Sequence, residues 1–194
     1  MPRNNFALAA LLFILPATGQ DVKNTSYKAP NGERVQRLEI EVDATLEQVW
    51  NIVGSSEGWK SFMAPAVEMD LKTGGKFHSN YKLGSKVGDP GTIYNTVLAY
   101  VPLRMLSLKI GLTPMFPQEV REAGTVFAVM NMDEAGPGKV RISEVMAGWQ
   151  EGPGWDKAYM FFEEGNAYTL RELAKRIKDG PVDWDQKARA VKHP

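Results

Sequence analysis

The sequence predicts an α+β protein in which a curved antiparallel sheet of about six to seven strands surrounds one long C-terminal helix. Short stretches of alternating apolar and polar residues follow one another from residue 67 to residue 146, separated by turn residues. One more such stretch precedes them, and two short helical patterns come directly after it. The last apolar pattern, residues 155–178, repeats about every 3.6 residues and is typical of a helix that packs on a sheet.

The composition excludes several classes of protein. The 194 residues suffice for one domain, and 23 basic against 23 acidic side chains give zero net charge, which argues against nucleic-acid binding. Because the chain has no Cys, thiol catalysis, disulfide bonds and Cys-ligated metal sites are impossible. Two His residues, His78 and His193, are too few for a His-rich zinc site, and the sequence has no glycine-rich nucleotide motif. We therefore expect no metal and no cofactor.

The first residues differ from all that follow. Arg3 precedes the apolar run Phe6–Leu15, and small residues continue to Gly19. This order is typical of a secretory signal peptide over residues 1–19, which predicts a secreted or periplasmic protein with no membrane span once the leader is removed. A buried N-terminal helix is the alternative. The polar residues 20–33 are predicted to be a linker.

The folded domain begins with a half-buried strand and two short helices. Residues 35–42 alternate between apolar and charged side chains, as expected for a strand with one buried face. Thr45 and Gln48 have the spacing of a capping box, which predicts the start of the first helix. Ser55 or Ser56 is expected to cap the second helix.

Six further stretches have the alternating pattern of strands: residues 67–71, 76–83, 92–100, 104–110, 125–132 and 139–146. Residues 111–123 contain two prolines and are predicted to be a loop. Because Gly180-Pro181 ends the last helix, the domain is predicted to span residues 34–180. Residues 181–194 are expected to form a loose polar tail.

Several local strings occur in an order that resembles one known family: Val49-Trp50, Glu57-Gly58-Trp59-Lys60, Asp70, Thr73-Gly74-Gly75-Lys76-Phe77, Gly91-Thr92-Ile93, Pro102, Leu106, Gly148-Trp149 and Phe162-Glu163-Glu164-Gly165-Asn166. Over about residues 35–178 the chain is similar to the START-related (SRPBCC, helix-grip) superfamily, and within it to the branch named for the activator of heat shock protein 90 ATPase homologue. The resemblance implies a hydrophobic-ligand pocket between sheet and helix. It implies no single activity, since the superfamily includes lipid carriers, polyketide cyclases and chaperone partners.

One acidic residue lies on an otherwise apolar strand face. Glu144 shares its phase with Val140, Ile142 and Met146. A carboxylate inside an apolar cavity would have a raised pKa and could act as an acid or base, which makes Glu144 the candidate catalytic residue. The alternatives are a bulge that turns the side chain outward and a pairing with an arginine.

A polar residue also lies on the sheet-facing side of the last helix. Asn166 is one turn from Phe162 and one turn from Leu170, so a ligand oxygen, a tyrosine or a water could be its partner. The neighbouring Gly165 is unfavourable inside a helix, so its presence needs a reason. It either allows close packing on the sheet or leaves extra room in a cavity, and close packing is the preferred interpretation.

Other polar candidates are predicted to face solvent. The register of His78 matches Lys76 and Lys82, and Glu68 and Asp70 share the face opposite the apolar residues of their strand. These residues are therefore interpreted as a solvated surface rather than a catalytic or metal site.

The predicted ligand-binding residues lie on inward registers or at the closed end: Trp59, Phe62, Phe77, Tyr81, Met130, Glu144, Trp155, Tyr159, Phe162 and Asn166. Met115-Phe116-Pro117, in the long loop, is expected to form a lip of the pocket.

The favoured function is an exported, non-catalytic binding protein that holds a small hydrophobic or lipid-like molecule. An enzyme of the cyclase or hydrolase type is the first alternative, and it would need Glu144, Asn166, Tyr81 or Tyr159 to converge on one ligand. A chaperone ATPase-activator-like partner is the second, and the leader argues against it. No particular protein partner follows from the sequence.

Overall fold

The structure is a computed structural model that describes residues 21–192. The predicted leader, residues 1–19, and His193 lie outside the described residues. Within residues 21–192, no helix combines the length and the apolar character needed to cross a membrane.

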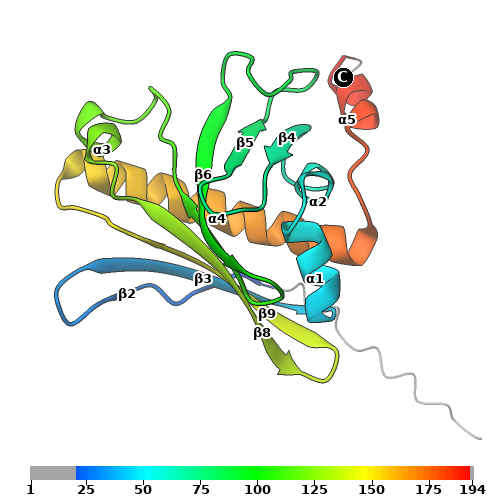
Figure 1. The fold of residues 1–194 in the computed structure, drawn as a ribbon, viewed down its shortest axis with the longest axis horizontal. Coiled ribbons are helices and arrows are strands. Elements are labelled where there is room, and N and C mark those ends of the chain that lie inside the picture. The colour runs from blue at the N-terminus through cyan, green and yellow to red at the C-terminus, as the bar shows by residue number, and fades with distance from the viewer. Residues whose placement is uncertain (1–20, 193–194) are drawn as a thin grey trace, which may run out of the picture.

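The described strands form a single antiparallel sheet, with the strand order β1-β3-β9-β8-β7-β6-β5-β4 and with β2 paired to β3 (Figure 1). The strands are β1 (Lys23–Asn24), β2 (Tyr27–Lys28), β3 (Arg34–Asp43), β4 (Ala66–Met69), β5 (Lys76–Asn80), β6 (Ile93–Val101), β7 (Met105–Lys109), β8 (Phe127–Gly136) and β9 (Lys139–Ala147). Because β3 pairs with β9, the first long strand lies beside the last.

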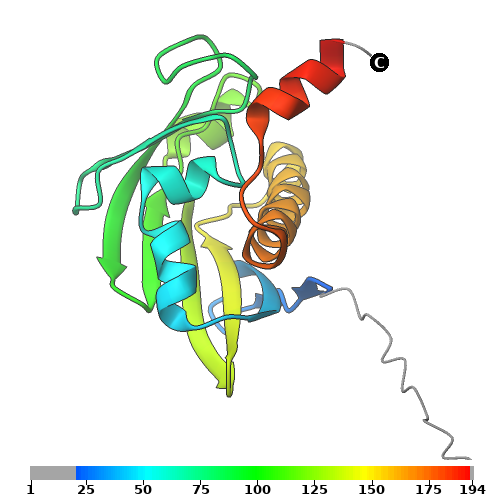
Figure 2. The same cartoon turned by 90° about the vertical axis from the view of Figure 1, so that its right-hand side faces the viewer.

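The helices occupy the concave side and the ends of this sheet (Figures 1 and 2). They are α1 (Leu46–Val53), α2 (Ser56–Lys60), α3 (Gln118–Ala123), α4 (Pro153–Asp179) and α5 (Trp184–Lys192). α4 crosses the sheet and packs on β3 and β9, while α1 contacts β8 and α2 contacts β4. This is the helix-grip arrangement, and it confirms the predicted fold class.

Local sequence signals start the two short helices as expected. Thr45 accepts a hydrogen bond from the Gln48 amide at 3.3 Å, and the Gln48 side chain accepts one from the Thr45 amide at 2.8 Å. This reciprocal pair satisfies two donors that the first helical turn leaves free. Ser55, rather than Ser56, caps α2 by accepting from the Gly58 amide at 3.1 Å.

Apolar residues from the inner face of the sheet and from α1, α2 and α4 build the main core. Leu38, Ile40 and Val42 alternate with charged residues along β3 and are at most 2% exposed. A second cluster lies near the start of α4, where Trp149 and Trp155 pack with Val120 of α3. The two clusters together hold α4 at both of its ends against the sheet.

Two segments that were expected to be irregular or loose are ordered. Within residues 20–33, the predicted linker, β1 and β2 pair with β3, and the Arg37 amide also donates to the Ser26 hydroxyl at 3.0 Å. The predicted loop at residues 111–123 contains α3, which buries Val120 completely. Both segments cover an edge or an end of the core that would otherwise be exposed.

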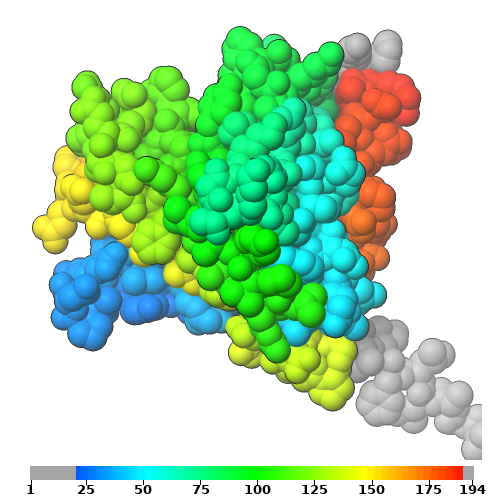
Figure 3. Space-filling model, viewed as in Figure 1, coloured from blue at the N-terminus to red at the C-terminus, as the bar shows by residue number. Residues whose placement is uncertain are grey.

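The C-terminal segment is likewise not a loose tail. Its helix α5 lies beside the end of the sheet that carries α2, as the space-filling view also shows (Figure 3). The Trp184 indole donates to the Lys60 carbonyl at 2.6 Å, and the Val182 amide donates to the Ser61 carbonyl at 2.8 Å. These bonds tie the end of the chain to the turn that follows α2.

α1 and α2 meet closely at a glycine. A Cβ atom added at Gly58 would lie 1.8 Å from the Ile52 carbonyl oxygen, which belongs to the backbone of α1. Gly165 of α4 is the opposite case, because a Cβ atom there would meet nothing within 4 Å.

We expect Gly58→Ala to lower the free energy of unfolding by about 3 kcal/mol, because the backbone of α1 cannot move aside without losing core contacts. Gly165→Ala serves as the control and should stabilise α4 by up to about 1 kcal/mol. Urea denaturation followed by circular dichroism measures both. A Gly58→Ala variant as stable as the wild type would contradict this packing.

Candidate functional site

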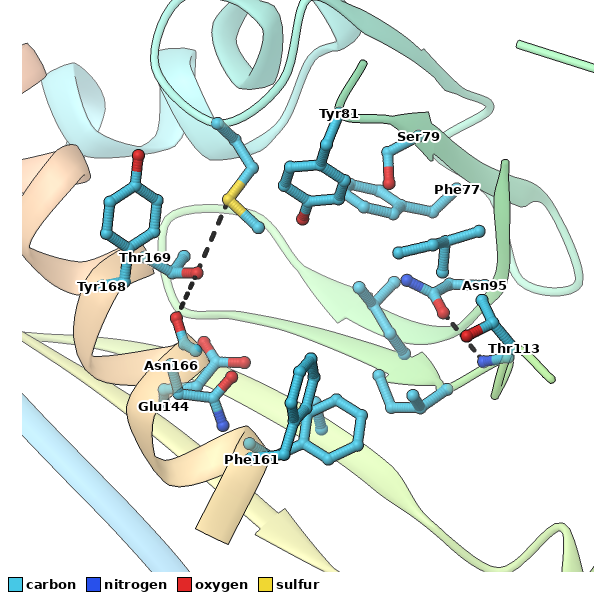
Figure 4. A pocket seen from close by; sticks show the side chains of 18 of the residues that line it. Phe77, Ser79, Tyr81, Asn95, Thr113, Glu144, Phe161, Asn166, Tyr168 and Thr169 are labelled. Carbon is cyan, nitrogen blue, oxygen red and sulfur yellow. Dashed lines mark hydrogen bonds between the residues drawn. The ribbon is translucent and has the colours of Figure 1, made fainter. Parts of the chain in front are cut away.

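A pocket of about 330 Å³ lies between α4 and the inner face of strands β5–β9 (Figure 4). Most of its exposed surface is apolar, with a few polar groups among the aromatic and aliphatic side chains. Its lining residues are Trp59, Met63, Phe77, Ser79, Tyr81, Ile93, Asn95, Leu108, Ile110, Gly111, Thr113, Met115, Phe116, Ala128, Glu144, Phe161, Phe162, Gly165, Asn166, Tyr168 and Thr169. Small-molecule pockets have this size and this mixture of side chains.

Large side chains surround the pocket where it meets solvent. Met115 is 68% exposed, and the aromatic residues Tyr81, Phe161 and Tyr168 are 44–46% exposed although they line the pocket. Met115 belongs to the loop that the sequence predicted as a lip, and the structure places it there. A long thioether side chain next to aromatic rings adapts to ligands of different shape.

Glu144 faces the pocket from the inner side of β9. Its neighbours in register are Leu38 of β3 and Met130 of β8, so the carboxylate interrupts an apolar row across the sheet. Its Oε2 atom is buried and has no hydrogen-bond partner among the described residues. Burial raises the pKa of Glu144 from 4.5 to about 7, because a buried charge loses its hydration. The predicted inward orientation is therefore observed, without a bulge and without an arginine partner.

Asn166 lies beside Glu144 and belongs to a chain of hydrogen bonds. Its Nδ2 donates to the Gln36 Oε1 atom at 3.0 Å and to the Met146 sulfur at 3.0 Å. The Gln36 Nε2 atom donates in turn to the Tyr159 carbonyl at 2.9 Å. Gln36 is fully buried and is the partner of Asn166 that the sequence analysis did not identify, although it shares the inward phase of Leu38.

Tyr81 closes the opposite side of the pocket with its hydroxyl directed inward (Figure 4). Loss of hydration is the main cause that raises the pKa of Tyr81 to about 12, and the charge of Glu144 contributes in the same direction. The phenol therefore stays protonated at physiological pH, and it can donate or accept a hydrogen bond.

Gly165 leaves open space in the pocket and does not serve to bring α4 close to the sheet. It lines the pocket, and the space that a Cβ atom would occupy is open. The preferred interpretation, close approach of α4 to the sheet, is therefore wrong, and the alternative of extra cavity space is the observed one.

Six of the ten predicted ligand-binding residues lie on the pocket: Trp59, Phe77, Tyr81, Glu144, Phe162 and Asn166. Phe62 and Met130 do not line it, because both are buried in the main core at 0% and 3% exposure. Trp155 and Tyr159 pack in or against the second cluster around Trp149. Their inward registers are correct, but other side chains fill the space in front of them.

Several polar residues on the pocket wall were missed, because the sequence alone does not distinguish a polar residue that lines a pocket from one that is buried in the core. Ser79 lines the pocket from β5 but was not selected as a site residue. Asn95 lines the pocket from β6 and accepts a hydrogen bond from the Gly111 amide at 2.8 Å. Phe161 was overlooked because it precedes the predicted stripe residue Phe162, and both rings reach the pocket.

The remaining polar candidates lie on the surface, as predicted. Glu68 pairs with Lys76, and Asp70 pairs with Lys72 at 2.7 Å. His78 packs edge-on against Tyr94 with ring centroids 4.8 Å apart, and burial lowers its pKa. No group of three or more His, Asp or Glu side chains in the described part of the chain could hold a metal ion.

The fold and the pocket together define a START-related, helix-grip protein. The family model described as "Activator of Hsp90 ATPase homolog 1-like protein" matches residues 43–178, and the chain belongs to this family. A comparison with curated protein sequences found no match.

Solved structures with the same fold are distant in sequence. Protein MLL2253 from Mesorhizobium loti is 15% identical with a TM-score of 0.60, over 77% of this chain and 100% of that one. CalU16 from Micromonospora echinospora is 15% identical with a TM-score of 0.59, over 89% and 92% of the two chains. Aha1 from Colwellia psychrerythraea, solved as a dimer, is 12% identical with a TM-score of 0.57, over 75% and 97%. These likenesses establish the fold.

The burial of Glu144 predicts a pH-dependent stability. Because the folded protein holds this proton up to about pH 7 and the unfolded chain releases it near 4.5, the contribution of Glu144 to stability is greatest below pH 4.5 and falls as the pH rises to about 7. At about 1.4 kcal/mol per pH unit, the loss from this group amounts to about 3 kcal/mol.

Glu144→Gln should therefore raise the free energy of unfolding at pH 8 by up to about 3 kcal/mol and by much less at pH 5. Glu164→Gln, an exposed carboxylate on α4, is the matched control and should change stability at neither pH. Denaturant titrations at the two pH values measure the difference. An equal gain at both pH values would mean that Glu144 is not protonated by burial.

Proposed function

We propose that this protein is a binding protein for a small, mainly apolar molecule, which occupies the pocket between α4 and the sheet. The observation that carries the proposal is an apolar pocket of about 330 Å³ with a carboxylate whose buried Oε2 atom has no hydrogen-bond partner within residues 21–192. A buried polar group without a partner costs stability, and a ligand hydrogen bond would remove that cost. Family membership agrees with this function, since the resemblance to START-related proteins implies a hydrophobic-ligand pocket between sheet and helix.

Catalysis is the second candidate, and one observation favours it. A carboxyl group with a pKa of about 7 can accept or donate a proton near neutral pH, as a general acid or base must. Against it, the Asn166 amide is already committed to Gln36 and Met146, and Tyr159 lies outside the pocket. The set of converging groups that a cyclase or hydrolase would need is therefore incomplete, and binding is the better-supported function.

We also propose that the protein acts outside the cytoplasm. The support is the order of charged, apolar and small residues in the first 19 positions, which is typical of a cleaved leader. An exported carrier or sensor combines this leader with the pocket.

Binding is tested with prodan, a neutral fluorophore whose emission reports an apolar environment. We expect the wild type to enhance its fluorescence and Gly165→Leu to abolish the enhancement, because the added side chain enters the space that Gly165 leaves open. The control variant Glu164→Leu places a leucine one position earlier, at an exposed site, and should bind prodan as the wild type does. Equal binding by all three proteins would place the probe elsewhere and remove the pocket from the function.

Export is tested by expressing the full chain in its own organism and measuring its intact mass. The expected mature protein begins at Gln20, after cleavage behind Gly19. Recovery of the complete 194-residue chain would contradict export and would favour a partner inside the cell.

A further inference from the structure

The hydrogen bonds around Asn166 have a fixed direction. The Tyr159 carbonyl can only accept, so the side-chain amide of Gln36 must turn its nitrogen toward it. The Gln36 oxygen then faces Asn166 and receives the Asn166 nitrogen at 3.0 Å. Both Asn166 hydrogens are directed to partners, since the second contact goes to the Met146 sulfur. Asn166 therefore has only its Oδ1 atom, an acceptor, left for a ligand.

The groups next to this oxygen are acceptors as well. Glu144 presents a carboxylate with a buried oxygen that finds no partner in the described part of the chain. Thr169 has a single hydroxyl hydrogen, which the Gly165 carbonyl at 3.0 Å and the Met63 sulfur at 3.5 Å can accept, so its oxygen is left as an acceptor for a ligand. Asn166 and Thr169 are three residues apart on α4 and share one face, and Figure 4 shows them on the same side of the pocket as Glu144.

The charges around the pocket have one sign. None of the described residues that line it is Lys, Arg or His, and Glu144 is its one ionisable carboxyl group. The other titratable lining groups are the phenols of Tyr81 and Tyr168, and burial raises the pKa of both. The strands beside Glu144 contribute Leu38 and Met130, which carry no charge.

We propose that the pocket selects an apolar molecule that carries a protonated amine, with the ammonium group held between Glu144, the Asn166 Oδ1 atom and Thr169. An ammonium group supplies several donors where the protein supplies acceptors, and its charge neutralises the carboxylate. The aromatic rings of the pocket add cation–π attraction for such a group. This inference rests on the proposed binding function and adds its ligand class.

Three probes with one apolar skeleton test the proposal: naphthylmethylamine, naphthylmethanol and naphthoate. Their dissociation constants are measured by calorimetry on the full mature protein at pH 6 and pH 8. We expect the amine to bind about tenfold more tightly than the alcohol at pH 8, and naphthoate to bind most weakly. Since Glu144 ionises around pH 7, the amine should gain about tenfold between pH 6 and pH 8, whereas the alcohol should not change.

The same measurements on variants assign the effect to one group. Glu144→Gln keeps the shape of the side chain and removes its charge, so it should cancel both the amine preference and its pH dependence while retaining the alcohol. Glu164→Gln removes one negative charge from the exposed face of the same helix and should behave as the wild type.

The outcomes distinguish a failure of the proposed ligand class from a failure of the binding function itself. Equal or tighter binding of the alcohol, or an amine preference that survives in Glu144→Gln, overturns the ligand class and leaves the apolar pocket as a binding site. If none of the three probes binds, the ligand class and the binding function fail together.

Discussion

One helix has to cover the concave face of a sheet of nine strands, and it is too narrow to do so. A helix with its side chains is about 10 Å wide, whereas neighbouring strands are about 4.8 Å apart. α4 therefore packs on β3 and β9, and α1 and α2 close the end near β4 and β8. α4 packs less closely on β5–β7, so a space remains between the helix and the inner face of these strands. The pocket is the space that this difference in width leaves open.

Several polar side chains lie where α4 meets β9, and they differ in whether the protein supplies their hydrogen-bond partners. Gln36 and Asn166 face each other and are joined by a hydrogen bond, and each has one further partner within the protein. Glu144 lies two residues from Met146 on the same strand face, but its Oε2 atom has no hydrogen-bond partner among the residues that the structure describes. The first arrangement orients α4 on the sheet. The second keeps a polar group available inside an apolar enclosure.

The sequence predicts the elements whose own residues carry a periodic pattern. The alternation along β3 and the capping box at Thr45 both correspond to observed structure, and so does the inward position of Glu144. β1 and β2 were missed because each has only two residues, too few to show an alternating pattern. α5 was missed because it is held by a partner far away in sequence, the Lys60 carbonyl that receives Trp184. No local pattern records such a contact.

For the site, periodicity tells which side chains point inward but not which of them meet empty space. Phe62 and Phe77 are both inward aromatics, yet Phe62 is enclosed by core residues and Phe77 borders the pocket. The difference depends on how closely α4 approaches each strand. That distance follows from the packing of the whole molecule. Because the sequence does not reveal it, Gly165 was interpreted as a site of close packing, although it borders open space.

The pairing of β3 with β9 also governs how the molecule assembles. Residues that hydrogen-bond across this pair are about one hundred positions apart in the chain, as in the register of Ile40 with Ile142. Closing so long a loop has a high entropic cost and slows folding. The sheet can reach its final strand order only after nearly all of the domain has been synthesised. Because Glu144 lies on that closing strand, its carboxylate takes its place between Leu38 and Met130 only when the sheet is completed.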